Sequence, residues 1–154
     1  MGIVRTARWV DMAFRPVPQR SVLPELLAAL DAVMRDLPVD PDRVYVTGQS
    51  MGGVGTWGIV AAHPERFAAA VPVCGIWQVE DAPKMARVPV WAFHGEKDPM
   101  VPVAGSRKMI AALKTAGAAP RYTEYPGVGH NSWVTAYATD ELWDWLFQQK
   151  RKTR

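Results

Sequence analysis

A serine that could act as a nucleophile lies in the run Gly48-Gln49-Ser50-Met51-Gly52-Gly53. This Gly-x-Ser-x-Gly pattern follows a short β-branched and aromatic stretch and precedes a glycine-rich one, so we expect it to join a strand to a helix. On such a turn the serine has unusual backbone torsions, needs small neighbours two positions away on either side, and exposes its hydroxyl. It also lies at a helix N-terminus, where the backbone N–H of Met51 would face a developing oxyanion. The pattern predicts acyl transfer through Ser50.

The same glycines could instead form a strand–helix turn without catalysis, such as a phosphate cradle. The run lacks the lysine that a phosphate-binding P-loop requires. We therefore favour a nucleophile at Ser50.

A carboxylate that could orient the catalytic base is expected after the third predicted strand, in the run His94-Gly95-Glu96-Lys97-Asp98-Pro99. Side chains just beyond the C-terminal ends of parallel strands face one crevice, and we assign the acid to Asp98. Glu96 is the rival within the run, and Asp81 is a weaker one because it lies in an irregular stretch. Taken alone, Asp98 could equally form an Asx-type turn before Pro99.

The base is expected at His130, in a glycine-containing loop that follows the fourth predicted strand. Glycines allow such a loop to approach the nucleophile. His63 precedes Pro64 at a helix end and is interpreted as a capping or surface residue. His94 lies in a strand-end turn before the acid, where we expect it to hydrogen-bond the loop. The chain order serine, aspartate, histidine supports His130.

The elements that must position these residues alternate along the chain. Short apolar runs predict four strands, at residues 43–47, 67–73, 88–93 and 121–125. Apolar residues at helical spacing predict four helices, at residues 21–37, 51–62, 103–116 and from 140 onward. This alternation predicts an α/β fold with a parallel sheet covered by helices on both faces.

Length and composition limit the remaining possibilities. The 154 residues suit a single domain, with an irregular segment at residues 1–20 and a basic tail at residues 150–154. The net charge of +3 owes much to that tail, which we interpret as a solvated end and not as a nucleic-acid site. No secretory leader or membrane-spanning run is evident, so a cytoplasmic protein without membrane partners is expected, with an exported chain whose leader has been removed as the alternative. One cysteine, Cys74, and three histidines show no metal-binding spacing, and neither metal nor cofactor is expected.

Residues 38–149 resemble the serine hydrolases grouped around dienelactone hydrolase, phospholipase/carboxylesterase and the polyhydroxybutyrate-depolymerase-like esterases. Three runs carry the resemblance: residues 40–53, 88–98 and 127–133. The resemblance implies the α/β-hydrolase fold and a carboxylesterase-type activity. It also implies that Ser50, Asp98 and His130 form a catalytic triad, with the Met51 N–H as one oxyanion donor.

The sequence departs from that group before Ser50. Members usually have further strands there and a His-Gly loop that supplies a second oxyanion donor. The chain thus resembles the C-terminal half of such a domain, a minimal α/β-hydrolase fold. Losing one donor typically costs about a hundred- to a thousandfold in rate, and residues 8–12 are a candidate replacement. The strand Val44–Thr47 would become a sheet edge, which predicts a homodimer through that edge.

The expected function is hydrolysis of short-chain or small soluble carboxylic esters, because little sequence remains for a lid. Trp77, Met100 and Trp133 each follow a strand end or a predicted triad residue, and they are our candidates for substrate binding, with core packing as the alternative for the tryptophans. Two other functions stay open. One is a prolyl-oligopeptidase-like peptidase, and the other is a non-catalytic remnant that acts as a binding or assembly module.

Overall fold

The computed structural model describes residues 22–151. The chain divides into two compact units, Met1–Val39 and Asp40–Arg154. In the first unit, helix α1 (Leu23–Asp36) occupies the region where the sequence predicts a helix, with Pro24 in its first turn. The predicted irregular segment, including residues 8–12, lies outside the described residues, as does the end of the basic tail.

The second unit is built on a four-stranded parallel sheet in the order β1-β2-β3-β4. The strands are β1 (Tyr45–Gln49), β2 (Ala69–Val73), β3 (Trp91–Gly95) and β4 (Arg121–Tyr125). Because the chain order equals the spatial order, all four C-terminal strand ends lie along one edge of the sheet. The prediction of four parallel strands is confirmed.

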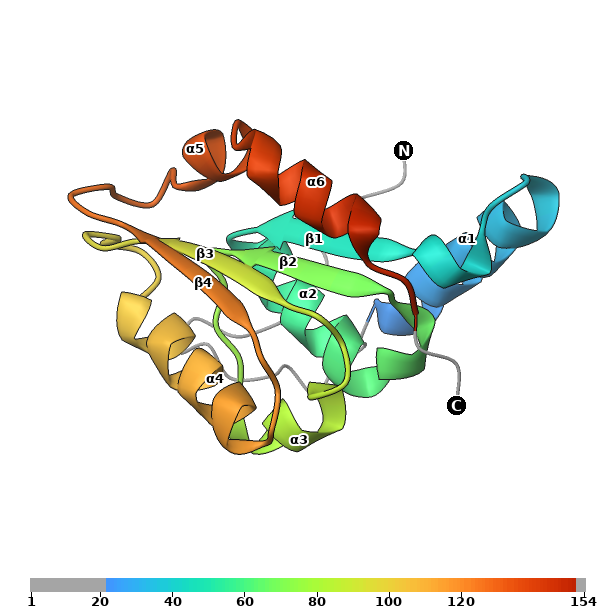
Figure 1. Cartoon of the computed structure of the whole chain (residues 1–154), viewed down its shortest axis with the longest axis horizontal. Helices are drawn as coiled ribbons and strands as arrows, with labels where there is room; N and C mark the ends of the chain where they lie inside the picture. Colours follow the sequence, from blue (N-terminus) through green and yellow to red (C-terminus); the bar gives the residue numbers. More distant parts are fainter. Residues whose placement is uncertain (1–21, 152–154) are drawn as a thin grey trace, which may run out of the picture. The chain divides into compact units, whose positions relative to one another are not determined.

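Helices cover both faces of this sheet, as predicted (Figure 1). One face carries α5 and α6, and the other carries α2, α3 and α4. Their bounds are α2 (Met51–Ala62), α3 (Ala82–Met85), α4 (Val103–Thr115), α5 (Trp133–Tyr137) and α6 (Asp140–Gln148). Short 3₁₀ turns span Pro41–Arg43, Pro64–Arg66 and Val79–Asp81. The two shortest helices, α3 and α5, have too few residues to show a periodic pattern and were not expected from the sequence.

The interior strands β2 and β3 are buried along their whole length, which explains their continuous apolar character. On the α5 and α6 side, Leu142 and Leu146 pack in one core cluster with Val71 and Phe93. Helix α2 contributes the fully buried Trp57 to the core. The sheet is therefore a rigid base for the loops at its C-terminal edge.

Two strands extend further than the sequence predicts. Strand β1 continues through Gly48 to Gln49, and β3 continues through His94 to Gly95. The expected strand-end positions were too early because neighbouring strands pair beyond them, with His94 opposite Glu124 in β4. As a result, the His94 side chain lies in the sheet and is completely buried, rather than in a turn.

No helix within residues 22–151 combines the length and the apolar character that crossing a membrane requires.

Candidate active site

Ser50 lies on the turn between β1 and α2. Its backbone torsions, φ 53° and ψ −116°, fall in a region that residues other than glycine rarely adopt. The turn is held by the Ser50 N–H, which donates to the Val73 carbonyl at 2.9 Å. A Cβ on Gly48 would collide with the backbone of Gly52, whereas a Cβ on Gly52 would meet open space. Of the two small neighbours that the sequence argument requires, only Gly48 is needed to avoid a clash.

The turn also places Ser50 immediately before a helix N-terminus. Met51 is the first residue of α2, so its backbone N–H has no partner within the helix. The aligned peptide dipoles make this end of the helix partly positive. Both features favour negative charge close to the Ser50 hydroxyl.

The glycine spacing near Ser50 does not form a phosphate cradle. Gly53, Gly55 and Gly58 have the Gly-x-Gly-x-x-Gly spacing of dinucleotide-binding proteins. All three are buried inside α2, after the turn, and not in a loop that could wrap a phosphate group.

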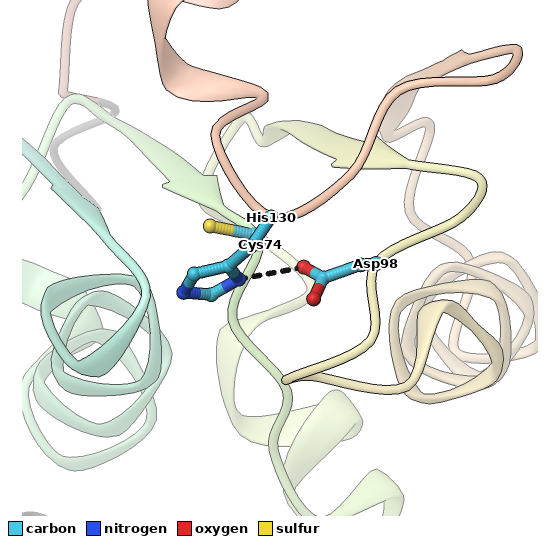
Figure 2. Close-up of side chains that lie close together, drawn as sticks. All are labelled: Cys74, Asp98 and His130. Carbon is cyan, nitrogen blue, oxygen red and sulfur yellow. Dashed lines mark hydrogen bonds and ion pairs between the residues drawn. The ribbon is translucent and has the colours of Figure 1, made fainter.

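His130 lies between Ser50 and Asp98. Its Nε2 is 2.9 Å from Ser50 Oγ, and its Nδ1 is 2.8 Å from Asp98 Oδ2. Figure 2 shows the second of these contacts, with the imidazole edge directed at the carboxylate. Because an ionised carboxylate only accepts hydrogen bonds, Nδ1 carries the proton and the Nε2 lone pair faces the Ser50 hydroxyl. This tautomer can remove the hydroxyl proton.

The Asp98 carboxylate is buried and has a full set of partners. Oδ1 accepts the N–H groups of Met100 at 2.8 Å and Val101 at 2.9 Å, while Oδ2 faces His130. Burial alone would raise the pKa of Asp98, but the hydrogen bonds from Val101, His130 and Met100 outweigh it and lower the pKa. Asp98 is therefore a carboxylate at neutral pH. The predicted Asx-type turn is also present, so one residue serves both roles.

The loops that carry Asp98 and His130 are bonded to each other. The Lys97 N–H donates to the Val128 carbonyl at 2.9 Å, and the Gly127 N–H donates to Glu96 Oε2 at 2.8 Å. A Cβ on Gly95 would collide with the Val128 and Gly129 carbonyls, so only glycine permits this approach. Glu96, the rival candidate for the acid, thus binds the backbone of the histidine loop.

The other rejected candidates lie away from His130. Asp81 accepts hydrogen bonds from Trp77, Gln78 and Lys84 on its own turn. His63 ends α2 and lies 3.5 Å from Glu65.

The three predicted substrate-binding residues have different surroundings. The Trp133 ring lies edge-on to the His130 ring, with the centroids 5.3 Å apart. Met100 follows Asp98 and is 65% exposed. Trp77 packs against Gly58 in the middle of α2, and its indole N–H donates to Asp81 at 2.9 Å. The structure thus brings Trp133 and Met100 to the Asp98–His130 pair, whereas Trp77 contacts Gly58 on α2 and Asp81 on the following 3₁₀ turn. Substrate binding by all three stays a prediction.

Sequence reasoning did not connect Cys74 with this site. Cys74 follows β2 directly, has a positive φ of 41°, and its Sγ accepts the Ser50 N–H at 3.3 Å. Its position after a strand, on the same edge as Ser50, was the available signal. Burial raises the pKa of the Cys74 thiol to about 11, so it stays protonated.

Cys74, Asp98 and His130 could in principle offer a metal one ligand atom each, all within 4.8 Å of one another (Figure 2). The group does not fit this use. Both nitrogens of His130 already face Ser50 and Asp98, and the thiol is held in its neutral form. The arrangement suits proton transfer rather than metal binding.

A serine on a strand–helix turn, with an aspartate and a histidine after later parallel strands, is the arrangement of α/β hydrolases. Residues 5–141 match the model of the dienelactone hydrolase family, and the chain belongs to that family.

Known proteins support this assignment. The crystal structure of a thermostable esterase is 38% identical, with a TM-score of 0.83 over 90% of this chain and 38% of that one. Esterase LipQ of Mycobacterium tuberculosis is 45% identical over 69 residues, which cover 44% of this chain and 15% of LipQ. The uncharacterized peptidase YuxL of Bacillus subtilis is 29% identical over 142 residues, covering 70% of this chain and 22% of YuxL. The chain spans only 14% and 28% of the first two curated relatives it matches. The family is thus one of α/β-hydrolase esterases.

Proposed function

We propose that this chain acts as a serine carboxylesterase, with Ser50 as the nucleophile, His130 as the general base and Asp98 as the residue that orients it. The observation that carries the proposal is the continuous hydrogen-bonded chain from Ser50 Oγ through His130 to Asp98 Oδ2, at 2.9 and 2.8 Å. Both distances lie within the range needed for proton transfer. Membership of an esterase-containing family adds to this support.

In the proposed reaction, His130 Nε2 removes the Ser50 proton while Oγ attacks the ester carbonyl carbon. Asp98 stabilises the imidazolium that forms, and the imidazolium then protonates the departing alcohol. Water, deprotonated by His130, hydrolyses the acyl-enzyme and restores Ser50. The Met51 N–H stabilises the oxyanion in both halves of the reaction.

The proposed substrates are short-chain or small soluble carboxylic esters. Met100 and Trp133 provide apolar surface beside Asp98 and His130, and Met51 is 42% exposed beside Ser50. We expect p-nitrophenyl acetate and butyrate to be hydrolysed faster than the matched p-nitrophenyl palmitate. A preference for palmitate would contradict the proposed substrate class.

A peptidase is the second candidate, and the similarity to YuxL is the observation that favours it. Parallel assays with an ester and an amide of the same acyl group, such as p-nitrophenyl acetate and p-nitroacetanilide, separate the two. The esterase proposal predicts turnover of the ester alone. Faster turnover of an aminoacyl p-nitroanilide would favour a peptidase, and no turnover of any substrate would favour a binding module.

We also propose that the chain forms a homodimer through β1. Within the described residues β1 pairs only with β2, so one side of the strand leaves backbone groups available for another chain. Sedimentation equilibrium at assay concentrations should give twice the mass of one chain. A wild-type protein that remains a monomer at assay concentrations would disprove the dimer.

A further inference from the structure

Behind the carboxylate of Asp98 lies a second histidine, His94, whose side chain is completely buried. Its Nε2 is 3.0 Å from the Val101 carbonyl oxygen and 3.2 Å from Asp98 Oδ2. Its Nδ1 is 2.7 Å from Ser106 Oγ on α4. A buried, fully partnered imidazole therefore contacts the same carboxylate oxygen as His130.

The partners of His94 fix where its proton lies. Both oxygens that face Nε2 are acceptors, so Nε2 must carry a proton. Burial lowers the pKa of His94, although the Val101 carbonyl and the Asp98 charge act in the opposite direction. The ring is therefore neutral, with its Nδ1 lone pair 2.7 Å from Ser106 Oγ. The Gly75 carbonyl lies 3.1 Å from the same oxygen, so this lone pair and that carbonyl are the two acceptors available to the single Ser106 hydroxyl proton.

The two oxygens of Asp98 are held differently. Oδ1 is fixed by two backbone N–H groups, from Met100 and Val101. Among the described residues, Oδ2 contacts the two histidines alone. His130 lies on a loop and its side chain is 24% exposed, whereas His94 is part of β3. His94 also binds the carbonyl of Val101, the residue whose N–H holds Oδ1. One imidazole thus restrains both ends of the carboxylate.

We propose that His94 is a positioning residue that keeps Asp98 Oδ2 directed at His130 Nδ1, by donating its Nε2–H towards Oδ2 and the Val101 carbonyl. This inference rests on the proposed function, because it assigns His94 a role in that reaction. The sequence predicts that His94 hydrogen-bonds the loop, and its bond to the Val101 carbonyl does so. The contact with Asp98 Oδ2 and the bond to Ser106 are additional to that expectation.

Two matched variants test this role. In His94→Gln the side-chain amide N–H₂ can reach the place of Nε2, whereas in His94→Asn the shorter side chain reaches only the place of Nδ1. Misplacing a catalytic group by about 1 Å can cost about a hundredfold, so we expect H94N to lose about tenfold or more in kcat. KM for p-nitrophenyl acetate should change by less than about twofold, because substrate does not touch His94. H94Q should recover most of kcat at a similar unfolding temperature.

Equal losses of kcat in both variants, in proportion to their losses of thermal stability, would show a purely structural role and overturn the proposal. If H94N does not fold, H94Q carries the test alone. A kcat within about threefold of wild type supports the positioning role, and a loss of about tenfold in folded H94Q overturns it.

A second readout does not depend on turnover. The proton between His130 Nδ1 and Asp98 Oδ2 should give a strongly downfield N–H resonance in the proton NMR spectrum, and H94N should shift or broaden it while H94Q retains it. A resonance unchanged in H94N overturns the positioning role. A wild-type chain that hydrolyses no ester but shows this pattern of resonances would overturn the proposed function and leave the positioning of Asp98 supported.

Discussion

Replacing Ser50 by alanine is expected to lower kcat/KM for p-nitrophenyl acetate by about a thousandfold or more, to the background of the remaining site. The variant lacks the Ser50 oxygen that His130 Nε2 contacts at 2.9 Å, so no acyl-enzyme can form there. Stability should change little, because the Ser50 backbone N–H still bonds to the Val73 carbonyl. Initial rates at matched protein concentration give the ratio directly.

Ser132 offers a matched control for that experiment. It lies two residues after His130, and the Cys74 thiol, a weak hydrogen-bonding group, is the partner available to its buried hydroxyl among the described residues. The Ser132→Ala variant should therefore keep its activity, because the hydroxyl that it removes bonds to none of Ser50, Asp98 and His130. Residual activity in S50A equal to that in S132A would contradict a nucleophilic role for Ser50.

Replacing Asp98 by asparagine is expected to lower kcat by about three to four orders of magnitude. If Oδ1 keeps the Met100 and Val101 N–H groups, the new N–H₂ faces His130 Nδ1 and favours the tautomer with the proton on Nε2. A protonated Nε2 cannot accept the Ser50 proton. Steady-state kinetics should show the loss mainly in kcat, since Asp98 is covered and does not contact substrate.

Glu96→Gln is the matched control, because it makes the same chemical change two residues earlier. The glutamine oxygen can still accept the Gly127 N–H, so kcat should stay within about threefold of wild type. A larger loss in E96Q than in D98N would reassign the acid to Glu96.

Asp98 also predicts a pH dependence of stability. Its pKa is lowered in the folded chain, so the stability gained from its ionisation is complete above the unfolded pKa of about 4. That stability is lost as pH falls through the lower, folded pKa. The difference in unfolding free energy between wild type and D98N should therefore shrink on acidification from neutral pH.

The overall fold could be predicted from the spacing of apolar residues along the chain, because few other folds would bury them. Buried parallel strands must be apolar along their length, as in β2. In the helices that cover them, apolar residues must recur every three to four positions. The positions of Ser50, Asp98 and His130 could be predicted because each follows the C-terminal end of a strand. In a sheet whose spatial order equals its chain order, those ends lie along one edge.

What the sequence did not reveal depends on contacts between distant segments. His94 was expected in a turn because nothing local shows that β4 pairs with β3 as far as Gly95. Its contact with Ser106 joins β3 to α4, and the position of α4 along β3 depends on how the helix packs on the sheet. The indole contacts of Trp77 with Gly58 and Asp81 likewise depend on how the loop after β2 returns over α2. A residue's place after a strand end therefore indicates the right edge of the sheet but not the direction of its side chain.

The most direct test of the account is covalent labelling of the purified chain with a fluorophosphonate, followed by peptide mapping by mass spectrometry. An activated serine oxygen displaces fluoride from phosphorus and retains the phosphonyl group. One adduct is expected, on Ser50, and it should form slowly or not at all in D98N. An unlabelled wild-type chain, or an adduct on a different residue, would contradict Ser50 as the nucleophile.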